Sequence, residues 1–309
     1  MSSHQVLFDA PGPRGRRIIL VGNVIGTLVV LGIGAWALWT MYENDQFRAE
    51  LWAPMVEARS WQYYFLPGLQ NTLVAAAYSV VLAMIFGTLF GVGRLASNPV
   101  LRWFCGVVVE FFRAVPVLIM MVAGWFLLGS TGWVSPSMAP LVAVVAALTL
   151  YNGAVIAELV RSGVHGLPRG QREAGLAIGM TRRKSIQHIE LPQALIAMLP
   201  ALVSQFVVIL KDSALGSIIT YSELLRNSRL LGSGSPFPIL QSLFVAAVLF
   251  IIINFILTKI AELAARRVGS LTSGRGAPPG QPDAAVEAAV ARVTLEPNPD
   301  IPDRPRQTP

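Results

Sequence analysis

The chain is 309 residues long, and 54% of its residues are hydrophobic while only 13% are charged. A soluble globular protein carries about 25% charged residues, so this composition indicates an all-α polytopic membrane protein instead. The net charge of +7 does not indicate nucleic-acid binding, because the arginines are dispersed at the ends of apolar segments, and the single Cys105 excludes an intramolecular disulfide.

Six stretches are long and apolar enough to cross the membrane, which takes about 20 residues for some 30 Å of hydrocarbon. They are residues 18–39, 66–96, 103–128, 138–157, 194–219 and 238–263. The first follows Arg14, Arg16 and Arg17, and Ala35-Trp36-Ala37 resembles a signal-peptide cleavage site. Its apolar stretch is longer than the core of such a peptide, so we expect a retained anchor rather than a cleaved signal.

Basic residues predict the orientation of these spans. With the N-terminus in the cytoplasm, Arg94, Arg102 and residues 161–184 fall inside, whereas Glu43, Asp45, Glu50 and Glu57 fall outside. This asymmetry follows the positive-inside rule, so we expect both termini to be cytoplasmic. The sequence therefore divides into a cytoplasmic segment (1–17), an extra N-terminal transmembrane helix (18–40), an extracytoplasmic segment (41–65), a transmembrane domain (66–265) containing a long cytoplasmic loop (158–193), and a disordered cytoplasmic tail (266–309).

The tail is rich in Gly, Pro and Ala from Gly269 onward, although residues 283–293 are compatible with a short helix. The long loop has more local order. Pro168, Arg169 and Gly170 precede a short helix over 173–178, in which Glu173 would lie near the helix N-terminus, and Gly179 is a plausible stop. A second short helix would start at the N-cap Thr181 and end at Leu191-Pro192, where the next span begins.

Two readings of this loop are open on physical grounds alone. It is either a solvated loop that satisfies the positive-inside rule or a compact knob of two angled helices with a specific task. Its spacing resembles the EAA signature of permease subunits of ATP-binding-cassette importers. The matching positions are Glu173, Ala174, Gly175, Gly179, Ile189, Leu191 and Pro192, with Gly175 standing where the family usually has alanine. That departure costs helix propensity of about 1 kcal/mol.

Further motifs resemble the permeases for polar amino acids, most closely the glutamate and aspartate branch. They are GLQNTL (68–73), FFRAVPVL (111–118), NGAVIAELVRSGVHGLPRGQREAG (152–175) and LKDSALGS (210–217). The resemblance implies the importer permease fold, with the loop as a coupling helix seated in an ATPase subunit. It also implies a second permease, identical or homologous, and an extracytoplasmic solute-binding protein, all working in a bacterial plasma membrane. ATP and Mg would be bound by the separate ATPase.

Charges inside the spans are the candidates for the translocation path, because a charge at a helix centre needs a partner or a wet cavity. Glu110 and Arg113 are three residues apart and can pair, either as a structural ion pair or at the border of the path. Pro116 removes a backbone hydrogen bond and favours a kink.

Lys211, Asp212 and Ser213 interrupt the fifth span. Either Lys211 snorkels and pairs with Asp212, or the helix breaks there, with Asp212 or Ser213 capping a half-helix that favours a substrate carboxylate. Glu158 and Arg161 are either ordinary interfacial charges or, with Gln171, support for coupling.

Gly87 and Gly91 form a small face that would pack within the chain or against another subunit. His4, His165 and His188 are scattered, so we expect neither a metal site nor a catalytic histidine.

The chain contains no GxxxxGK[ST] phosphate loop, HExxH motif or catalytic pair within the spans, so we expect a transporter subunit and not an enzyme. The main alternative is an ion-coupled secondary amino acid transporter, whose uptake would survive loss of any ATPase partner. A membrane-embedded enzyme is the weaker competitor.

Overall fold

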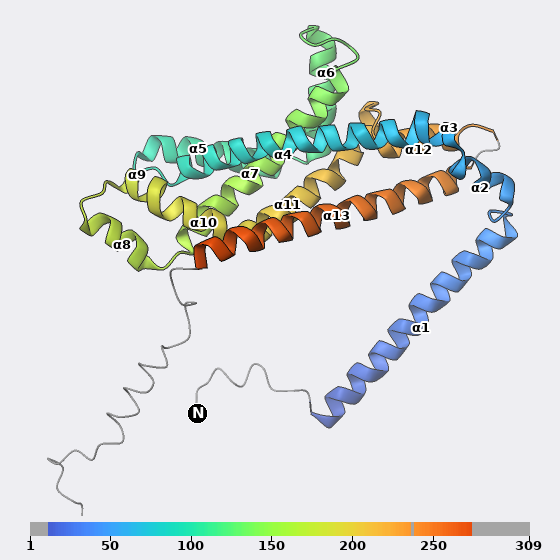
Figure 1. The fold of residues 1–309 in the computed structure, drawn as a ribbon, viewed down its shortest axis with the longest axis horizontal. Helices are drawn as coiled ribbons and strands as arrows, with labels where there is room; N and C mark the ends of the chain where they lie inside the picture. The colour runs from blue at the N-terminus through green and yellow to red at the C-terminus, as the bar shows by residue number, and fades with distance from the viewer. Residues whose placement is uncertain (1–11, 236–237, 274–309) are drawn as a thin grey trace, which may run out of the picture.

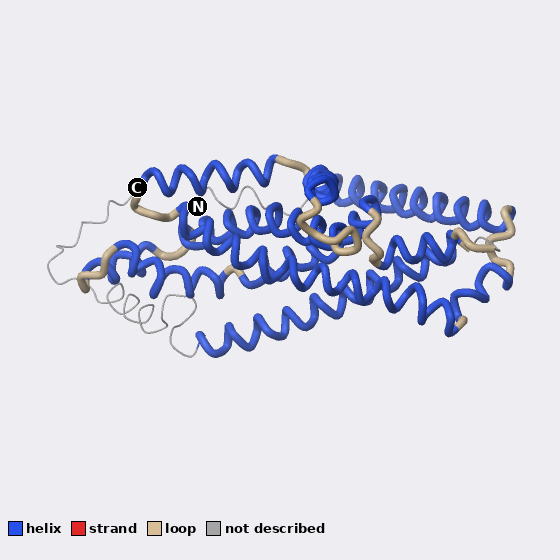
Figure 2. Tube along the Cα trace, turned by 90° about the horizontal axis from the view of Figure 1, so that it is seen from above, coloured by secondary structure: helices blue, strands red, loops and turns tan. Residues whose placement is uncertain are grey.

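The computed structural model describes residues 12–235 and 238–273, and this part of the chain is helical without a strand (Figures 1 and 2). The elements are α1 (Pro13–Glu43), α2 (Ala49–Val56), α3 (Ala58–Ser60), the π-helical turn η2 (Trp61–Phe65), α4 (Leu66–Arg94), α5 (Pro99–Ala114), α6 (Val117–Thr131), α7 (Ala139–His165), α8 (Arg169–Ala177), α9 (Arg182–Ser185), the π-helical turn η3 (Ile186–Glu190), α10 (Leu191–Ala197), α11 (Leu199–Asp212), the 3₁₀ turn η4 (Ser213–Ile219), α12 (Leu224–Gly232) and α13 (Ile239–Ser273).

The long helices run along one axis and form an elongated bundle (Figure 1). Within the described residues, five helices are long and apolar enough to span a membrane, or six spans if α5 and α6 count as one. The short helices α8 and α9 gather at one end of the bundle, while α2, α3 and α12 lie at the other (Figure 1). The predicted all-α, polytopic fold is therefore confirmed.

The third predicted span is not one continuous helix. The chain bends by 97° between α5 and α6, at Val115 and Pro116. Pro116 lacks an N–H and is in an extended conformation with ψ 132°, so it ends the hydrogen-bond ladder of α5 and starts α6. The predicted kink at Pro116 is confirmed, but the prediction of a continuous span over 103–128 was wrong.

Other predicted span boundaries need correction. An apolar stretch shows which residues can lie in the membrane, but it does not show where the helix begins or ends. The fourth span continues eight residues beyond Ala157, to His165, so the predicted loop begins later than residue 158. The fifth span starts at Leu199 and not at residue 194. Residues 266–273, assigned to the disordered tail, are helical in α13, and the short helix expected over 283–293 lies outside the described residues.

Close backbone contact between α4 and α7 forms the centre of the bundle. A Cβ at Gly87 would lie 2.8 Å from the carbonyl oxygen of Gly153, and a Cβ at Gly91 would lie 2.9 Å from that of Ala157. Only glycine lets the two backbones approach so closely. The small face of Gly87 and Gly91 therefore packs within the chain, which is the more frequent of the two expected outcomes.

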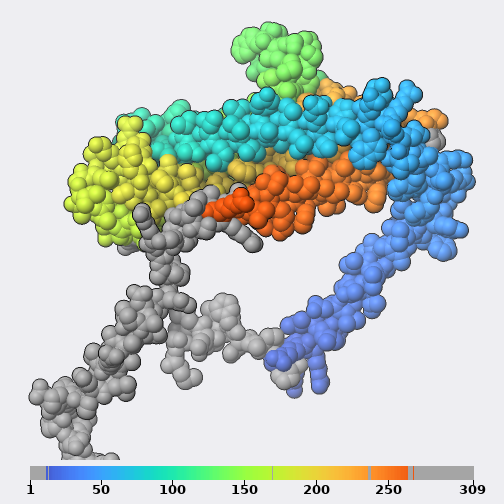
Figure 3. All heavy atoms as spheres, in the orientation of Figure 1, coloured from blue at the N-terminus to red at the C-terminus, as the bar shows by residue number. Residues whose placement is uncertain are grey.

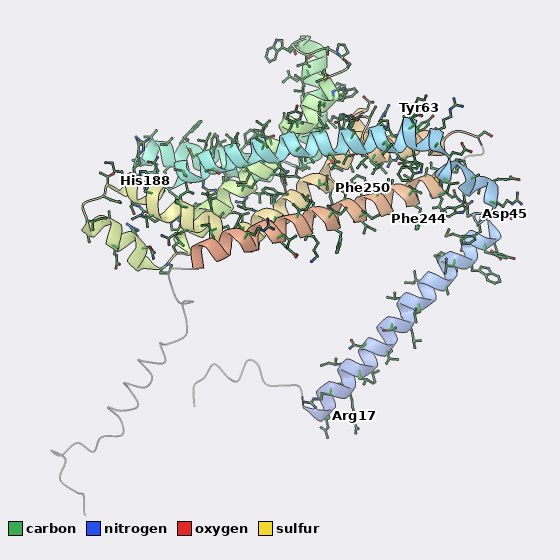
Figure 4. All side chains as sticks on the ribbon, viewed as in Figure 1. Arg17, Asp45, Tyr63, His188, Phe244 and Phe250 are labelled. Carbon is green, nitrogen blue, oxygen red and sulfur yellow. The ribbon has the colours of Figure 1, made fainter. Side chains whose placement is uncertain are left out.

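The first helix, α1, stands apart from the bundle (Figures 1 and 3), and its most apolar window has no buried residue. The segment after it is anchored. Gln241 of α13 donates to the carbonyl oxygen of Gln46 at 2.8 Å, and Trp52 of α2 meets Phe244 edge-on at 5.8 Å (Figure 4 labels Phe244). The extracytoplasmic segment predicted for residues 41–65 thus packs its α2 against α13.

Candidate functional site

The loop between α7 and α11 folds into a compact knob at one end of the bundle (Figure 1). We call residues 166–193, which comprise α8, α9, η3 and the start of α10, the knob. Its first helix, α8, is separated from α9 by a turn in which Gly179 has φ +82°, a left-handed conformation that suits glycine. The side chain of Thr181 caps α9 by accepting from the backbone N–H of Lys184 at 3.4 Å. Both turn signals predicted from the sequence are confirmed.

A buried carboxylate holds the second half of the knob together. Glu190 is only 3% exposed; its Oε1 accepts from the hydroxyl of Ser185 at 2.7 Å and pairs with the guanidinium of Arg182. A carboxylate at this depth needs such partners to offset its lost hydration. Sequence reasoning treated Arg182 as one of three like cations and missed Glu190, although an acid eight residues after Arg182 was the available signal.

Gly175 has a packing role in the knob. A Cβ at this position would lie 3.0 Å from Cδ1 of Ile189 and 3.1 Å from the hydroxyl of Ser185, so α8 lies close against η3. The alanine that the family usually has would push these side chains apart by a few tenths of an ångström. Glycine at position 175 therefore lets α8 and η3 approach each other closely. This packing partly offsets the cost of glycine in helix propensity.

The outer surface of the knob is mixed in character. Glu173 and Ala174 are exposed on α8, and the large apolar side chains of Leu176 and Ile178 are 42% and 73% exposed. His188 lies at the same end of the molecule (Figure 4). Glu173 is the fifth residue of α8 and lies outside its first turn, so the predicted interaction of its charge with the helix N-terminus was wrong, because α8 already begins at Arg169.

The knob joins the bundle through α10. Gln193 donates to the side-chain oxygen of Gln171 at 3.1 Å, which ties α8 to α10, and Met198 packs where Gly163 leaves room on α7. The helical path runs unbroken through Leu191 and Pro192, so the prediction that the second short helix ends there was wrong. Proline is tolerated because the preceding π-helical turn already interrupts the regular hydrogen-bond ladder.

A network of five charged side chains links three helices near the knob. The predicted pair Glu110 and Arg113 is present at 3.2 Å, and Glu158 pairs with Arg161 at 2.5 Å. Arg94, at the end of α4, joins them: it lies 2.7 Å from Glu158 and 3.1 Å from Glu110. The sequence had assigned Arg94 to topology alone, since no local spacing connects it to residues on α5 and α7.

Lys211, Asp212 and Ser213 lie apart from that network, at the junction of α11 and η4. The ion pairs of the described residues do not include one between Lys211 and Asp212, so local pairing, the first of the two alternatives left open by the sequence, was wrong. The helix changes there from α to 3₁₀, but neither side chain caps it, and the buried Ser213 hydroxyl donates back to the carbonyl of Leu210 at 2.7 Å. The interruption is real, whereas the capping was wrong.

The GLQNTL motif fastens α4 to the start of α12 at the end of the bundle opposite the knob. Asn71 donates to the carbonyl of Ser222 at 2.8 Å, and the hydroxyl of Thr72 accepts from the N–H of Leu224 at 3.1 Å. A Cβ at Gly68 would lie 2.8 Å from Cα of Leu224. These long-range bonds explain the polar residues at the start of an otherwise apolar span.

Two buried polar residues escaped the sequence analysis. Asn152 of α7 is fully buried and accepts from Gln205 of α11 at 2.5 Å. Glu223 is also fully buried and caps α12 by accepting from the N–H groups of Leu225 at 2.8 Å and Arg226 at 2.6 Å. Burial raises the pKa of the Glu223 carboxyl to about 7, despite the opposing effect of these bonds and of Arg229 and Arg226.

Within the described residues, no group of three or more His, Cys, Asp or Glu side chains is placed to hold a metal ion. The geometry presents a pinned knob, an exposed mixed surface on α8 and a charge network whose last member, Arg161, lies four residues before the end of α7. Such an arrangement can receive a displacement at the knob and pass it to three helices.

The chain resembles a known family of membrane transport proteins. Residues 79–270 match the family described as binding-protein-dependent transport system inner membrane component. Over 250 residues the chain is 44% identical to the glutamate transport system permease protein GluD of Corynebacterium glutamicum, covering 79% of this chain and 90% of that protein. It is 31% identical over 219 residues to the glutamate/aspartate import permease protein GltK of Escherichia coli O157:H7, covering 69% and 93%.

Solved structures show the same fold. A crystal structure of an amino acid ABC transporter with histidines matches with a TM-score of 0.59 and 27% identity, over 66% of this chain and 93% of that chain. An inward-facing structure of the MetNI methionine ABC transporter matches with a TM-score of 0.57 over 69% and 99%, and at 20% identity it supports the fold alone.

Proposed function

The chain belongs to the family of binding-protein-dependent transport system inner membrane components, as the permease subunit of an ATP-binding-cassette amino acid importer, and we propose that it carries glutamate or a closely related polar amino acid. The observation that supports this cargo is the 44% identity to a glutamate permease across most of both chains. Like its relatives, it is a multi-pass membrane protein that works with ATPase subunits, a second permease and a solute-binding protein.

The knob is the proposed receiver of the ATPase. Its exposed apolar side chains Leu176 and Ile178, next to the charge of Glu173, suit a groove on a soluble partner. The internal pin of Glu190 with Ser185 keeps the second half of the knob together, because α9 and η3 are joined by a buried, charge-assisted hydrogen bond. ATP and Mg would stay in the partner, since this chain has no phosphate loop.

The displacement would then pass to the bundle through α7. The knob begins directly after α7, at Gly166, and Glu158 lies seven residues before His165, the last residue of that helix. Through Arg94 its movement also reaches α4 and α5. We assign the five-residue network to this transmission. Glu110 and Arg113 keep a second candidate role at the path, because they are partly exposed on α5.

Lys211 is the proposed contact for a substrate carboxylate. It is exposed, it has no carboxylate partner among the ion pairs of the described residues, and it lies where the helix changes type. Substituting Lys211→Met should reduce amino acid uptake while the ATPase still co-purifies. If uptake of every acidic and amide amino acid is unchanged in that variant, Lys211 has no role in the path.

The orientation proposed from the sequence places both termini and the knob in the cytoplasm. Arg182, Arg183 and Lys184 at the knob and Arg94 at the end of α4 lie at one end of the bundle, whereas Glu50 and Glu57 belong to the other. The same orientation sets the knob on the side where ATP is available.

The direct test is to purify the chain with its partners and identify the amino acid in the solute-binding protein. Bound glutamate, together with ATP hydrolysis that rises when the loaded binding protein is added, would support the proposal. Uptake that persists after deletion of the ATPase would instead support an ion-coupled secondary transporter.

A further inference from the structure

The helix α6 leaves the bundle sideways. It is bent by 97° from α5, and Figure 1 shows it projecting away from the axis along which α4 and α13 run. Figure 2, turned by 90°, shows it nearly end-on beside the same helices. Because α4, α7 and α13 are membrane spans, α6 lies close to the plane of the membrane and leaves the bundle midway along its length.

α6 has two apolar faces and no charged residue. One face packs on α7, where Met121 is fully buried and a Cβ at Gly124 would lie 3.8 Å from Cβ of Ala143. The opposite face carries Ile119, Phe126 and Leu127, which are all more than half exposed and recur at helical spacing. A helix that is apolar all round belongs in an interior or against a membrane partner.

The loop that follows α6 distinguishes a protein partner from lipid. Trp133 at its start is 79% exposed, and no hydrogen bond among the described residues satisfies the backbone N–H of Trp133 or Val134. The space-filling view shows this tip standing clear of the bundle (Figure 3). Irregular backbone at membrane depth is tolerated only where protein or a water-filled cavity covers it, because lipid chains offer no hydrogen bonds.

The chain itself does not cover this tip within its described part. α1, the other apolar helix outside the bundle, lies on the opposite side of it (Figure 1). The ATPase and the solute-binding protein are soluble and would act at the two ends of the bundle. The remaining partner of the importer with a surface inside the membrane is the second permease.

We infer that α6 and residues 132–138 form an arm that packs inside the second permease subunit, with Ile119, Phe126 and Leu127 against it. This inference rests on the proposed function, since it takes its partner from the importer. It adds the surface of contact and its geometry: an in-plane helix inserted sideways, which would bring each permease's α6 to the other's bundle. The partner would also supply acceptors to the loop backbone.

Photo-crosslinking in the assembled importer tests this arm. A benzophenone amino acid replaces one side chain, as in Phe126→p-benzoylphenylalanine, which is close in shape to the original residue. The control is Leu28→p-benzoylphenylalanine on α1, because Leu28 is 63% exposed and Phe126 is 65% exposed. After irradiation of the complex in lipid, the adducts are separated by size and mapped by mass spectrometry.

The arm predicts a strong permease-to-permease adduct from position 126 and a weak one or none from position 28. No adduct at position 126, an adduct within the same chain, one with a soluble subunit, or equal yields at both positions would overturn it. Co-purification of the ATPase and ATP-dependent uptake are measured on the same samples. If the ATPase co-purifies and uptake depends on ATP but no adduct forms, only the arm is wrong. If the unmodified chain neither binds the ATPase nor supports ATP-dependent uptake, the proposed function itself is contradicted.

Discussion

The guanidinium of Arg94, on the last residue of α4, lies 2.7 Å from the carboxylate of Glu158 in α7. The same guanidinium reaches Glu110 of α5 at 3.1 Å. One largely buried cation thus joins three helices beside the knob. Since Glu158 also pairs with Arg161, two residues predicted for coupling and two predicted for the path belong to one network.

Removing the central cation should destabilise the assembled protein. In Arg94→Gln the carboxylate of Glu158 loses one of its partners at a site where both side chains are mostly buried, which should cost about 1–3 kcal/mol. Thermal unfolding of the purified complex measures the loss. Arg48→Gln is the control, because Arg48 and Asp45 form an exposed pair and its loss should change stability by less than about 1 kcal/mol. Equal effects of the two substitutions would contradict the role of Arg94.

Contact between α4 and α7 should be intolerant of a single methyl group. Gly87→Ala would place its Cβ 2.8 Å from the Gly153 carbonyl oxygen, so the helices must separate, at a cost of about 1–3 kcal/mol. Gly106→Ala is the matched control, since no atom lies within 4 Å of the added methyl and alanine favours a helix by about 1 kcal/mol. The unfolding temperature should fall for Gly87→Ala and should stay the same or rise for Gly106→Ala. An unchanged unfolding temperature in Gly87→Ala would show that the close packing of α4 and α7 is absent.

The sequence predicted the features that depend on local chemistry. Gly179 and Thr181 mark the turn of the knob because left-handed φ and N-capping are properties of single residues. Proline and pair spacing likewise predicted the break at Pro116 and the ion pair of Glu110 and Arg113.

Long-range contacts were beyond such reasoning. Arg94 meets Glu158 across 64 positions, and Thr72 meets Leu224 across 152, and without the fold nothing in the sequence relates them. The 97° size of the bend was also inaccessible, because proline ends a hydrogen-bond ladder without setting the direction that follows.

The pin inside the knob should control coupling. Glu190→Gln removes the charge that pairs with Arg182 and leaves that guanidinium unmatched, so α9 and η3, the second half of the knob, should move less as a unit. We expect amino acid uptake per ATP hydrolysed to fall several-fold while the ATPase remains bound. His188→Ala is the control, because His188 is exposed on the same π-helical turn. If Glu190→Gln takes up as much amino acid per ATP hydrolysed as the unchanged chain, Glu190 does not control coupling.

The cap of α12 should make stability depend on pH. The pKa of Glu223 rises from 4.5 to about 7 in the folded chain, so between these values the folded state holds a proton that the unfolded state has released. Its contribution to stability is therefore greatest below pH 4.5 and is lost as the pH rises toward 7.

The difference in unfolding temperature between Glu223→Gln and the unchanged protein isolates this contribution, because other groups titrate equally in both. The substitution should become less harmful, relative to the unchanged protein, as the pH is raised from 5 to 8. A difference that does not change over this range would show that Glu223 is ionised throughout.

The central claim is that the knob transmits ATP hydrolysis to transport, and the ratio of the two rates in proteoliposomes tests it most directly. Gly179→Pro cannot adopt the φ of +82° that the turn requires, whereas Gly170→Ala on α8 meets no atom within 4 Å and serves as the control. With the ATPase and binding protein present, the unchanged chain and Gly170→Ala should couple glutamate uptake to ATP hydrolysis. Gly179→Pro should hydrolyse ATP without uptake or lose the ATPase. Normal uptake by Gly179→Pro, or uptake by the unchanged chain without ATP, would contradict the account.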